Sequence, residues 1–508
     1  MTSRTARRAT GLIGALLLFA VVSKPCAAAE AARPNILFIL TDDQGRQTLG
    51  CYGGKHVATP HLDRLAKDGI RFDVAYVTPQ CTPTRASLFT GQHTARQGMW
   101  HVIGWYGYPW ARVAEPAFVE QLPRSTFTLP KGLRAAGYAT GMAGKWHLTN
   151  NADGNYNGLK PEAADAYGFD FVAPSGPGST GEGDKWVDYL TDQAIGFIER
   201  QQTRERDRPW FFYLSHHTIH GKVSAPAELV AKHRAAGAPE SGLNSAVYLA
   251  ALEHLDNSIG RLMAKLDQLG LARRTIVVFL SDNGGVHSVY DPKDFTNGAG
   301  GGLTKLRVEH EEFSNAPFRA GKGSPYEGGL RVPCLIRWPE GFNAGGVSAT
   351  PIHVIDWLPT FLELAGAKIP AEHVVDGVSL APLLRGVGIP ERSLYWYLPL
   401  YDLRWGATPC AVVRDCEWKL IEYFGDSFDA EGNYRPEPRS ELFNLHTDPG
   451  ERIDLAAQEP KRTEMLRRSL QRWLKSVPAA IPTTNPHYDS AKSLRETREK
   501  QPWNAAAK

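Results

Sequence analysis

A cysteine, a proline and an arginine stand at fixed spacing within Cys81–Gly91 and form the most distinctive chemical pattern of this 508-residue chain. Pro83 lacks an N–H and has a fixed φ, so it suits the first turn of a helix and puts Cys81 at or just before the helix N-terminus. Unpaired N–H groups and the helix dipole favour negative charge there, and Arg85 follows one turn later on the same face. The pattern predicts an anion site beside a nucleophile, although a buried cysteine before an ordinary helix gives the same sequence.

Two pairs of oxygen-bearing side chains follow apolar runs of the chain. Asp42 and Asp43 form the first pair, and Asp282 and Asn283 form the second. Adjacent buried carboxylates repel each other unless a cation joins them, and oxygen ligands suit a hard divalent cation. The alternative is a pair of solvated turns in which Asp and Asn cap the next segment, because these residues are common in turns.

Basic and imidazole side chains follow two further apolar runs. Lys145 and His147 lie two residues apart and point the same way in an extended chain, so both face one anion. His216, His217 and His220 follow the next run. Three histidines are compatible with zinc, but no acid or cysteine stands at the matching spacing.

Four apolar runs precede these polar clusters, at 35–40, 138–142, 210–215 and 275–280. Continuous apolar runs are typical of strands buried on both faces of a parallel sheet. Open α/β sheets bind ligands beyond the carboxyl ends of their strands, so the four clusters are expected to converge. Helical patterns are predicted at 61–67, 129–137 and 252–269.

The pattern changes in the last quarter of the chain. Short strand-like runs at 394–397, 410–414 and 418–423 predict an antiparallel sheet, and a helix is expected near 461–474. We therefore predict a signal peptide at 1–29, a catalytic domain at 30–385, a C-terminal subdomain with antiparallel sheet and helix at 386–478, and a polar tail at 479–508.

An aromatic segment at 99–110 follows the cysteine motif closely. Its Gly- and Pro-punctuated sequence does not bury so many aromatic rings easily. Trp100, His101 and Trp105 are therefore candidates for a substrate rim on which sugar rings stack, and core packing is the alternative.

The Cys81–Arg85 segment resembles the Cys-x-Pro-x-Arg signature of type I sulfatases, with Thr84 where the family commonly has Ser. Near residue 220 the family usually shows His-x-Pro-His, and here Ile219 replaces Pro. The resemblance extends from about Pro34 to about Lys475. Further matches in family order are Gly144–His147, Ser281–Gly284, Gly321–Gly329 and Asp376–Leu380.

The resemblance implies an alkaline-phosphatase-like α/β sandwich around a mostly parallel sheet, with a smaller C-terminal α+β subdomain. It also implies that Cys81 is oxidised to formylglycine (3-oxoalanine) by a formylglycine-generating maturation enzyme, and that the hydrated aldehyde attacks sulfur. The implied ligands of one Ca²⁺ per chain are Asp42, Asp43, the modified Cys81, Asp282 and Asn283. The implied catalytic residues are Cys81, Arg85, Lys145, His147, His220 and Lys322.

The N-terminus reads as a targeting segment, because Arg4, Arg7 and Arg8 precede a short apolar run and small residues follow at 27–29. Its apolar run is too short to span a bilayer, so we expect no membrane span and an exported, periplasmic or secreted protein. Cleavage removes four of the 57 basic residues and none of the 54 acidic ones, which leaves a nearly neutral chain. No basic cluster indicates a nucleic-acid partner.

The resemblance implies a sulfuric ester hydrolase that acts on a sulfated carbohydrate or an aryl sulfate. A phosphodiesterase or phosphonate monoester hydrolase of the same fold, and an inactive glycan-binding relative, are the alternatives. The sequence leaves open whether Cys410 pairs with Cys416, or Cys51 with Cys334.

Overall fold

The computed structural model describes Met1 and residues 33–494, apart from 104–106, 151, 178–182, 287–312, 343–344, 430–432 and 493. Residues 33–508 group as one compact unit, separate from residues 1–32. The predicted signal peptide, apart from Met1, lies outside the described residues. Among the helices that the structure describes, none is both long enough and apolar enough to cross a membrane.

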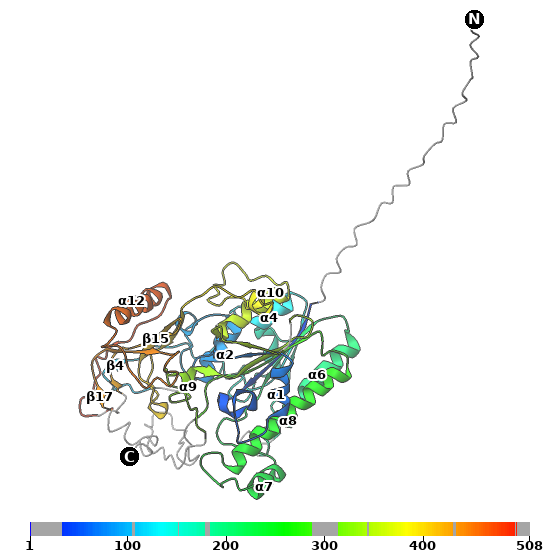
Figure 1. Cartoon of the computed structure of the whole chain (residues 1–508), viewed down its shortest axis with the longest axis horizontal. Helices are drawn as coiled ribbons and strands as arrows, with labels where there is room; N and C mark the ends of the chain where they lie inside the picture. The colour runs from blue at the N-terminus through cyan, green and yellow to red at the C-terminus, as the bar shows by residue number, and fades with distance from the viewer. Residues whose placement is uncertain are drawn as a thin grey trace. The chain divides into compact units, whose positions relative to one another are not determined.

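An eight-stranded sheet forms the centre of the fold (Figure 1). From β8 to β6, all neighbouring strands are parallel. The four predicted apolar strands are therefore present and adjacent, and the expected mostly parallel sheet is confirmed. In spatial order the strands are β11 (Gly346–Ser348), β2 (Ile70–Phe72), β10 (Cys334–Arg337), β8 (Thr275–Ser281), β1 (Asn35–Thr41), β7 (Trp210–Ser215), β5 (Ala139–Gly144) and β6 (Phe171–Val172).

Helices cover both faces of this sheet. The side chains of β1 alternate between two hydrophobic cores, with Phe38 in one and Ile39 in the other, and both are fully buried. This explains why the run is apolar at every position instead of every second one. The Phe38 core receives α2 (Cys81–Thr90), α4 (Leu129–Ala135) and α10 (Trp357–Leu364); the Ile39 core receives α1 (Pro60–Lys67), α6 (Val187–Arg204) and α8 (Ala246–Gln268).

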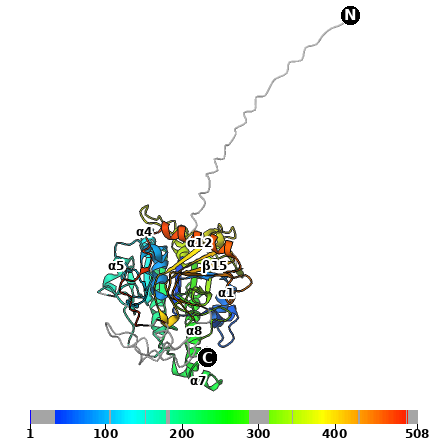
Figure 2. The same ribbon diagram turned by 90° about the vertical axis from the view of Figure 1, so that its left-hand side faces the viewer.

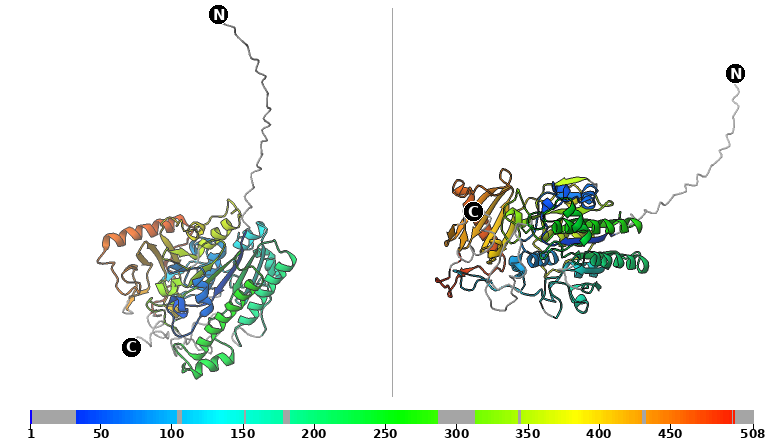
Figure 3. Two further views of the ribbon diagram at one scale, coloured as in Figure 1. Left: turned by 45° about the vertical axis from the view of Figure 1, so that its right-hand side comes forward. Right: turned by 90° about the horizontal axis from the view of Figure 1, so that it is seen from below.

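A smaller antiparallel sheet follows in the C-terminal part (Figures 2 and 3). One face packs against α12 (Pro460–Ser476), and the other packs against Tyr326 and Leu330 of the preceding part. The expected C-terminal sheet and helix are therefore present, with ends within two residues of the prediction. The strands in spatial order are β13 (Leu394–Leu398), β14 (Cys410–Asp415), β15 (Trp418–Tyr423) and β18 (Arg439–Asn444).

Described residues between 479 and 494, within the predicted polar tail, contact the rest of the protein. β19 (Thr483–Thr484) pairs with β4 (Val113–Ala114). The Asn485 amide donates to the carbonyl oxygens of Pro109 and Ala111 at 2.8 and 2.6 Å, and Leu494 is buried. A few specific contacts fix this segment without the apolar periodicity that sequence analysis relies on.

Shorter elements complete the described chain. The five cysteines that the structure describes are all free. Cys410 therefore does not pair with Cys416, and Cys51 does not pair with Cys334. The remaining elements are α3 (Thr94–Gln97), α5 (Ala164–Tyr167), α7 (Ala227–Ala235), α9 (Glu327–Leu330), α11 (Ala381–Leu384), β3 (Ala75–Tyr76), β9 (Arg331–Val332), β12 (Ile352–His353), β16 (Ser427–Phe428), β17 (Tyr434–Arg435) and five 3-10 helices, η1 (Arg46–Thr48), η2 (Gly50–Tyr52), η3 (Pro161–Ala163), η5 (Val354–Asp356) and η6 (Leu403–Trp405).

Candidate active site

The polar clusters meet where four neighbouring parallel strands end. Asp282, Asp42, His216 and Lys145 follow β8, β1, β7 and β5, which are consecutive in the sheet. Because parallel strands share one carboxyl edge, side chains far apart in the chain come together there. The expected convergence is confirmed by this strand order.

Helix α2 brings the cysteine to the same edge. Cys81 is the first residue of α2, Pro83 lies in its first turn, and Gly91 ends it with φ 65°, a conformation that glycine adopts without strain. Every residue of the helix is buried, and Cys81 is only 1% exposed. The predicted helix start is therefore correct, and the thiol sits inside the protein.

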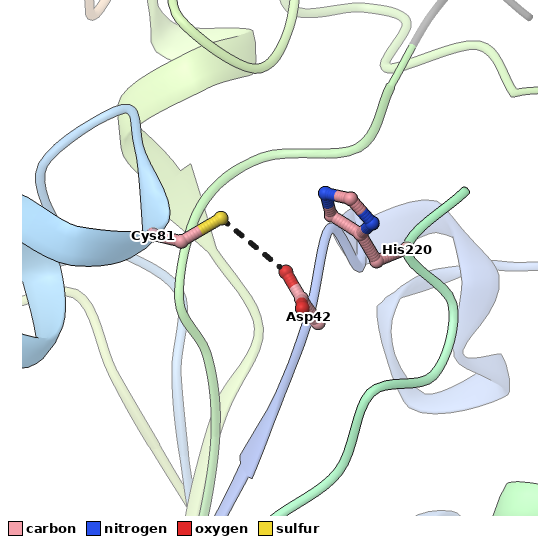
Figure 4. Close-up of side chains that lie close together, drawn as sticks. All are labelled: Asp42, Cys81 and His220. Carbon is pink, nitrogen blue, oxygen red and sulfur yellow. Dashed lines mark hydrogen bonds between the residues drawn. The ribbon is translucent and has the colours of Figure 1, made fainter. Parts of the chain in front are cut away.

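Carboxylates surround the thiol. Cys81 Sγ lies 3.5 Å from Asp42 Oδ1 (Figure 4), and Asp42, Asp43, Cys81 and Asp282 each offer one ligand atom within 4.8 Å of the others. The Asn283 amide donates to Asp43 Oδ1 at 2.8 Å, while its own Oδ1 is buried without a hydrogen-bond partner among the described residues. Buried acceptor oxygens of this kind fit a hard cation such as Ca²⁺.

Three buried cations each pair with one carboxylate of this cluster. Lys145 forms an ion pair with Asp42. Lys322 Nζ lies 2.7 Å from Asp43 Oδ1, and the Arg85 guanidinium donates to Asp282 Oδ2 at 2.7 Å through Nη2 and at 3.1 Å through Nε. The list of residues that share this site is therefore Asp42, Asp43, Cys81, Arg85, Lys145, Asp282, Asn283 and Lys322.

The carboxylates do not all ionise with equal ease. Burial tends to raise the pKa of Asp42, but Lys145 and further cations outweigh it and hold this pKa well below its ordinary value. Burial and the charge of Asp42 raise the pKa of Asp282 to about 6, and burial also raises that of Asp43. Asp43 and Asp282 therefore hold their protons more tightly than ordinary carboxyl groups, and a divalent ion bound to their oxygens would favour the ionised forms.

The Cys81 thiol is a poor nucleophile in this setting. Burial raises its pKa far above the ordinary value, and the charges of Asp282 and Asp42 raise it further. A thiolate is the reactive form of cysteine, so the site disfavours ordinary thiol chemistry.

Two histidines flank the cluster. His220 Nε2 lies 3.8 Å from Asp43 Oδ2, and His220 faces Asp42 and Cys81 (Figure 4). His147 is half-buried, has φ 55°, and its Nδ1 has no partner among the described residues. Burial lowers both pKa values well below the ordinary value, with Lys145 contributing for His147 and Lys322 for His220. Of the three histidines after β7, His220 offers a nitrogen within 4.8 Å of ligand atoms of Asp42 and Cys81, and His216 and His217 are fully buried.

Sequence reasoning missed residues that loops bring to the site. The Tyr156 ring lies with its centroid 4.4 Å from Lys145 Nζ, and the Trp405 ring lies 5.4 Å from Lys322 Nζ. Asp402 accepts from the Gln80 amide at 3.1 Å, just before Cys81. Tertiary packing determines the paths of the two segments that carry Tyr156 and Trp405. Their aromatic residue types were therefore the one signal in the sequence.

The structure contradicts the predicted substrate rim at two of its three residues. Trp100 is 5% exposed and packs edge-on against Tyr397 of the C-terminal sheet at 5.6 Å, so its faces are not available to a sugar. His101 is 2% exposed and packs against Phe118. Trp105 lies outside the described residues.

The loop that carries Lys322 is held by the C-terminal sheet. Glu327 opens α9 five residues later, and Lys419 Nζ of β15 lies 3.1 Å from Glu327 Oε1 and 2.8 Å from Glu451 Oε1. The Glu327 N–H donates to Glu451 Oε2 at 2.6 Å. All three side chains are fully buried, so these contacts tie the site to the C-terminal part.

Comparison with known proteins agrees with this arrangement. The family model described as "Sulfatase" matches residues 34–367, which carry every candidate site residue. The chain belongs to the sulfatase family. A second model, described as "N-sulphoglucosamine sulphohydrolase, C-terminal", matches residues 321–479, the part that includes Lys322 and the antiparallel sheet.

Relatives of this sulfatase have named activities of their own. Human arylsulfatase A is 32% identical, with 84% of each chain covered, and mouse steryl-sulfatase is 30% identical, with 88% of this chain and 82% of the relative covered. This sulfatase is accordingly a sulfuric ester hydrolase.

Solved structures share the fold at lower identity. A sulfatase from Pseudoalteromonas sp. superposes with a TM-score of 0.66 at 21% identity, covering 89% of this chain and 92% of the other. A phosphonate monoester hydrolase from Silicibacter pomeroyi superposes with a TM-score of 0.62 at 20% identity, covering 90% and 100%. These similarities establish the alkaline-phosphatase-like fold.

Proposed function

We propose that this sulfatase hydrolyses sulfate esters to an alcohol and inorganic sulfate with a formylglycine made from Cys81 and one bound Ca²⁺. The observation that carries the proposal is the position of Cys81. It opens a helix inside a cluster of three carboxylates, an unpartnered amide oxygen and three cations. A thiol that burial keeps protonated has no evident use there, whereas an aldehyde hydrate would supply an oxygen nucleophile and release sulfate by C–O cleavage.

Oxygen donors of this chain would hold the metal. We assign Asp42, Asp43, Asp282, Asn283 and the modified Cys81 as ligands, because these atoms are buried, converge and include the unpartnered Asn283 Oδ1. A bound Ca²⁺ supplies Lewis acidity toward sulfate oxygens and lowers the pKa of the nucleophile.

The chain's own cations would bind the sulfuryl group. Lys145 and Lys322 are fully or almost fully buried beside the nucleophile, where low dielectric strengthens their attraction for charge that develops on sulfate. Arg85 bonds Asp282 at two nitrogens and donates to Tyr213 Oη at 3.1 Å, so it is rigidly placed to orient the residue at position 81.

Proton transfers would use the flanking imidazoles. His147, with its free Nδ1 and lowered pKa, is suited to accept a proton when sulfate leaves. The His220 side chain is 29% exposed and lies beside the cluster, so we assign the leaving-group proton to His220 or a neighbouring lysine.

The substrate class is a sulfated carbohydrate or an aryl sulfate, in an exported protein that acts outside the cytoplasm. The two family models and the named relatives support a sulfated substrate, since both human arylsulfatase A and N-sulphoglucosamine sulphohydrolase carry that chemistry in their names. A formylglycine-generating enzyme is the expected maturation partner.

The test combines peptide mass analysis with sulfate release. In a host with the maturation machinery, the peptide containing Cys81 should show the mass of the aldehyde in place of the thiol. Cys81→Ala should abolish sulfate release and keep the melting temperature, whereas Cys410→Ala, which changes another buried free cysteine, should keep the modification. Active enzyme that contains only unmodified Cys81 would overturn the proposal.

A phosphonate monoester hydrolase is the second candidate, because such an enzyme shares this fold over 90% of the chain. Sulfate monoesters and phosphonate monoesters each carry one negative charge, so the charge of the site does not decide between the two activities and the rates must be compared directly. Rates on matched 4-nitrophenyl sulfate and 4-nitrophenyl phenylphosphonate decide between them, and a higher kcat/KM on the phosphonate would favour this second function.

A further inference from the structure

A turn after β5 carries an aromatic ring into the active site. Within the turn, the Asn155 N–H donates to the Gly158 carbonyl at 3.0 Å. The His147 N–H donates to the Asn155 carbonyl at 3.1 Å, so the turn is fastened to the backbone of a candidate catalytic residue. Tyr156 lies next in the chain and is therefore held in place by the site itself.

The neighbours of the Tyr156 ring are the polar groups of the site. Its centroid lies 5.1 Å from that of His147 and 5.4 Å from that of His220, and Lys145 Nζ lies 4.4 Å away over the ring. The centroid of the His217 ring lies 5.4 Å away. The Tyr156 ring thus lies beside both imidazoles to which we assign the proton transfers.

Core packing does not account for this placement. Tyr156 is half-buried and belongs to none of the hydrophobic clusters formed by the described residues. A structural tyrosine usually packs against aliphatic side chains, whereas the ring of this one packs against a lysine and two imidazoles of the site.

The position matches that of a leaving group. The sulfuryl group must lie near Lys145, and the leaving oxygen must come within hydrogen-bond reach of His220. Tyr156 is beside both residues, so whatever is attached to the leaving oxygen meets its ring. Aromatic rings add favourable contacts to flat or ring-shaped partners beyond simple burial.

We propose that Tyr156 is a specificity-determining residue whose ring contacts the leaving group of the sulfate ester and favours cyclic leaving groups, a pyranose or an aryl ring, over acyclic chains. This inference rests on the proposed sulfatase function of the same site. The ring, not the hydroxyl, carries the preference.

The test compares two competitors with leaving groups of the same kind. Cyclohexylmethyl sulfate and n-heptyl sulfate are both esters of seven-carbon primary alcohols, and differ in whether the carbons form a ring. Each is added to the hydrolysis of 4-nitrophenyl sulfate, and its inhibition constant is measured for the wild type and for Tyr156→Ala, Tyr156→Phe and Tyr488→Ala. The last is a matched control, because Tyr488 is 40% exposed and contacts Arg112 elsewhere on the protein.

The wild type should bind the cyclic competitor about ten-fold more tightly than the acyclic one. Tyr156→Ala should remove this ratio, while Tyr156→Phe and Tyr488→Ala should keep it. A merely structural role predicts that Tyr156→Ala lowers kcat and leaves the ratio unchanged, and that outcome would overturn the inference. So would a wild type without the preference, or a Tyr156→Phe variant that loses it. A wild type that hydrolyses no sulfate ester at all would instead contradict the proposed function.

Discussion

Neutralising Glu451 should change how stability depends on pH. Glu451 and Glu327 share the ammonium of Lys419, but Glu327 also has Arg331 and Arg414 nearby. Burial therefore raises the pKa of Glu451 from 4.5 to about 7, while the cations lower that of Glu327 to about 2 against the effect of burial. Below pH 7, the structure thus holds a neutral Glu451 beside an ionised Glu327.

Proton binding to Glu451 determines whether the free energy of unfolding rises or falls with pH. Between about pH 4.5 and 7, folded Glu451 retains a proton that the unfolded chain has released, so its contribution to stability is present below pH 4.5 and is lost as pH rises through 7. The difference between the two pKa values corresponds to about 3 kcal/mol in full, and most of this is lost between pH 5 and pH 8.

Glu451→Gln places a neutral isostere at this position at every pH. Urea unfolding monitored by tryptophan fluorescence should show the variant gaining about 2–3 kcal/mol relative to the wild type between pH 5 and pH 8. Glu372→Gln, which removes the same charge from an exposed loop, should track the wild type throughout. Parallel stability curves for the wild type and Glu451→Gln across this range would refute the raised pKa.

Three further outcomes are expected. Exhaustive chelation should lower both activity and melting temperature, because the buried carboxylates lose their cation; full activity in a sample shown to be metal-free would contradict the assignment. Asp282→Ala should abolish activity and cost about 3–5 kcal/mol in denaturation experiments, since Arg85 is left buried without its partner; a variant as stable as the wild type would count against that ion pair. Trp100→Ala should cost about 3–5 kcal/mol and reduce activity on sulfated glycan and aryl sulfate alike, and a selective loss on glycan would restore the stacking interpretation.

The central strands could be predicted because they are buried on both faces and therefore carry apolar residues at successive positions. The run at 35–40 is apolar throughout, and both of its faces meet helices. Helix α6 was not predicted, although it is long. It begins after Trp186, which has φ 61° and no capping side chain, so the usual start signal is missing. The antiparallel position of β10 depends on pairing between distant segments, which no local pattern contains.

The polar residues of the site were easier to predict from the sequence than the aromatic residues around them. Asp42, Lys145 and Asp282 follow strands, and the shared edge of a parallel sheet brings such residues together whatever the loops do. Tyr156 and Trp405 reach the site on loops, whose paths follow from packing and not from spacing in the sequence. For Trp100 the prediction was wrong. Its closeness to the cysteine motif in the chain suggested a substrate rim, but packing against the C-terminal sheet buries it.

The burial of Cys81 sets a time limit on the formylglycine modification that we propose for it. No maturation enzyme can reach a side chain that is 1% exposed inside a helix with no exposed residue. The buried contact that fastens the Lys322 loop needs Glu451, which is synthesised hundreds of residues after Cys81. At about 5–20 residues per second, translation alone leaves an interval on the order of tens of seconds. Chain order thus gives the nascent protein a period in which its cysteine is reachable, and folding ends that period.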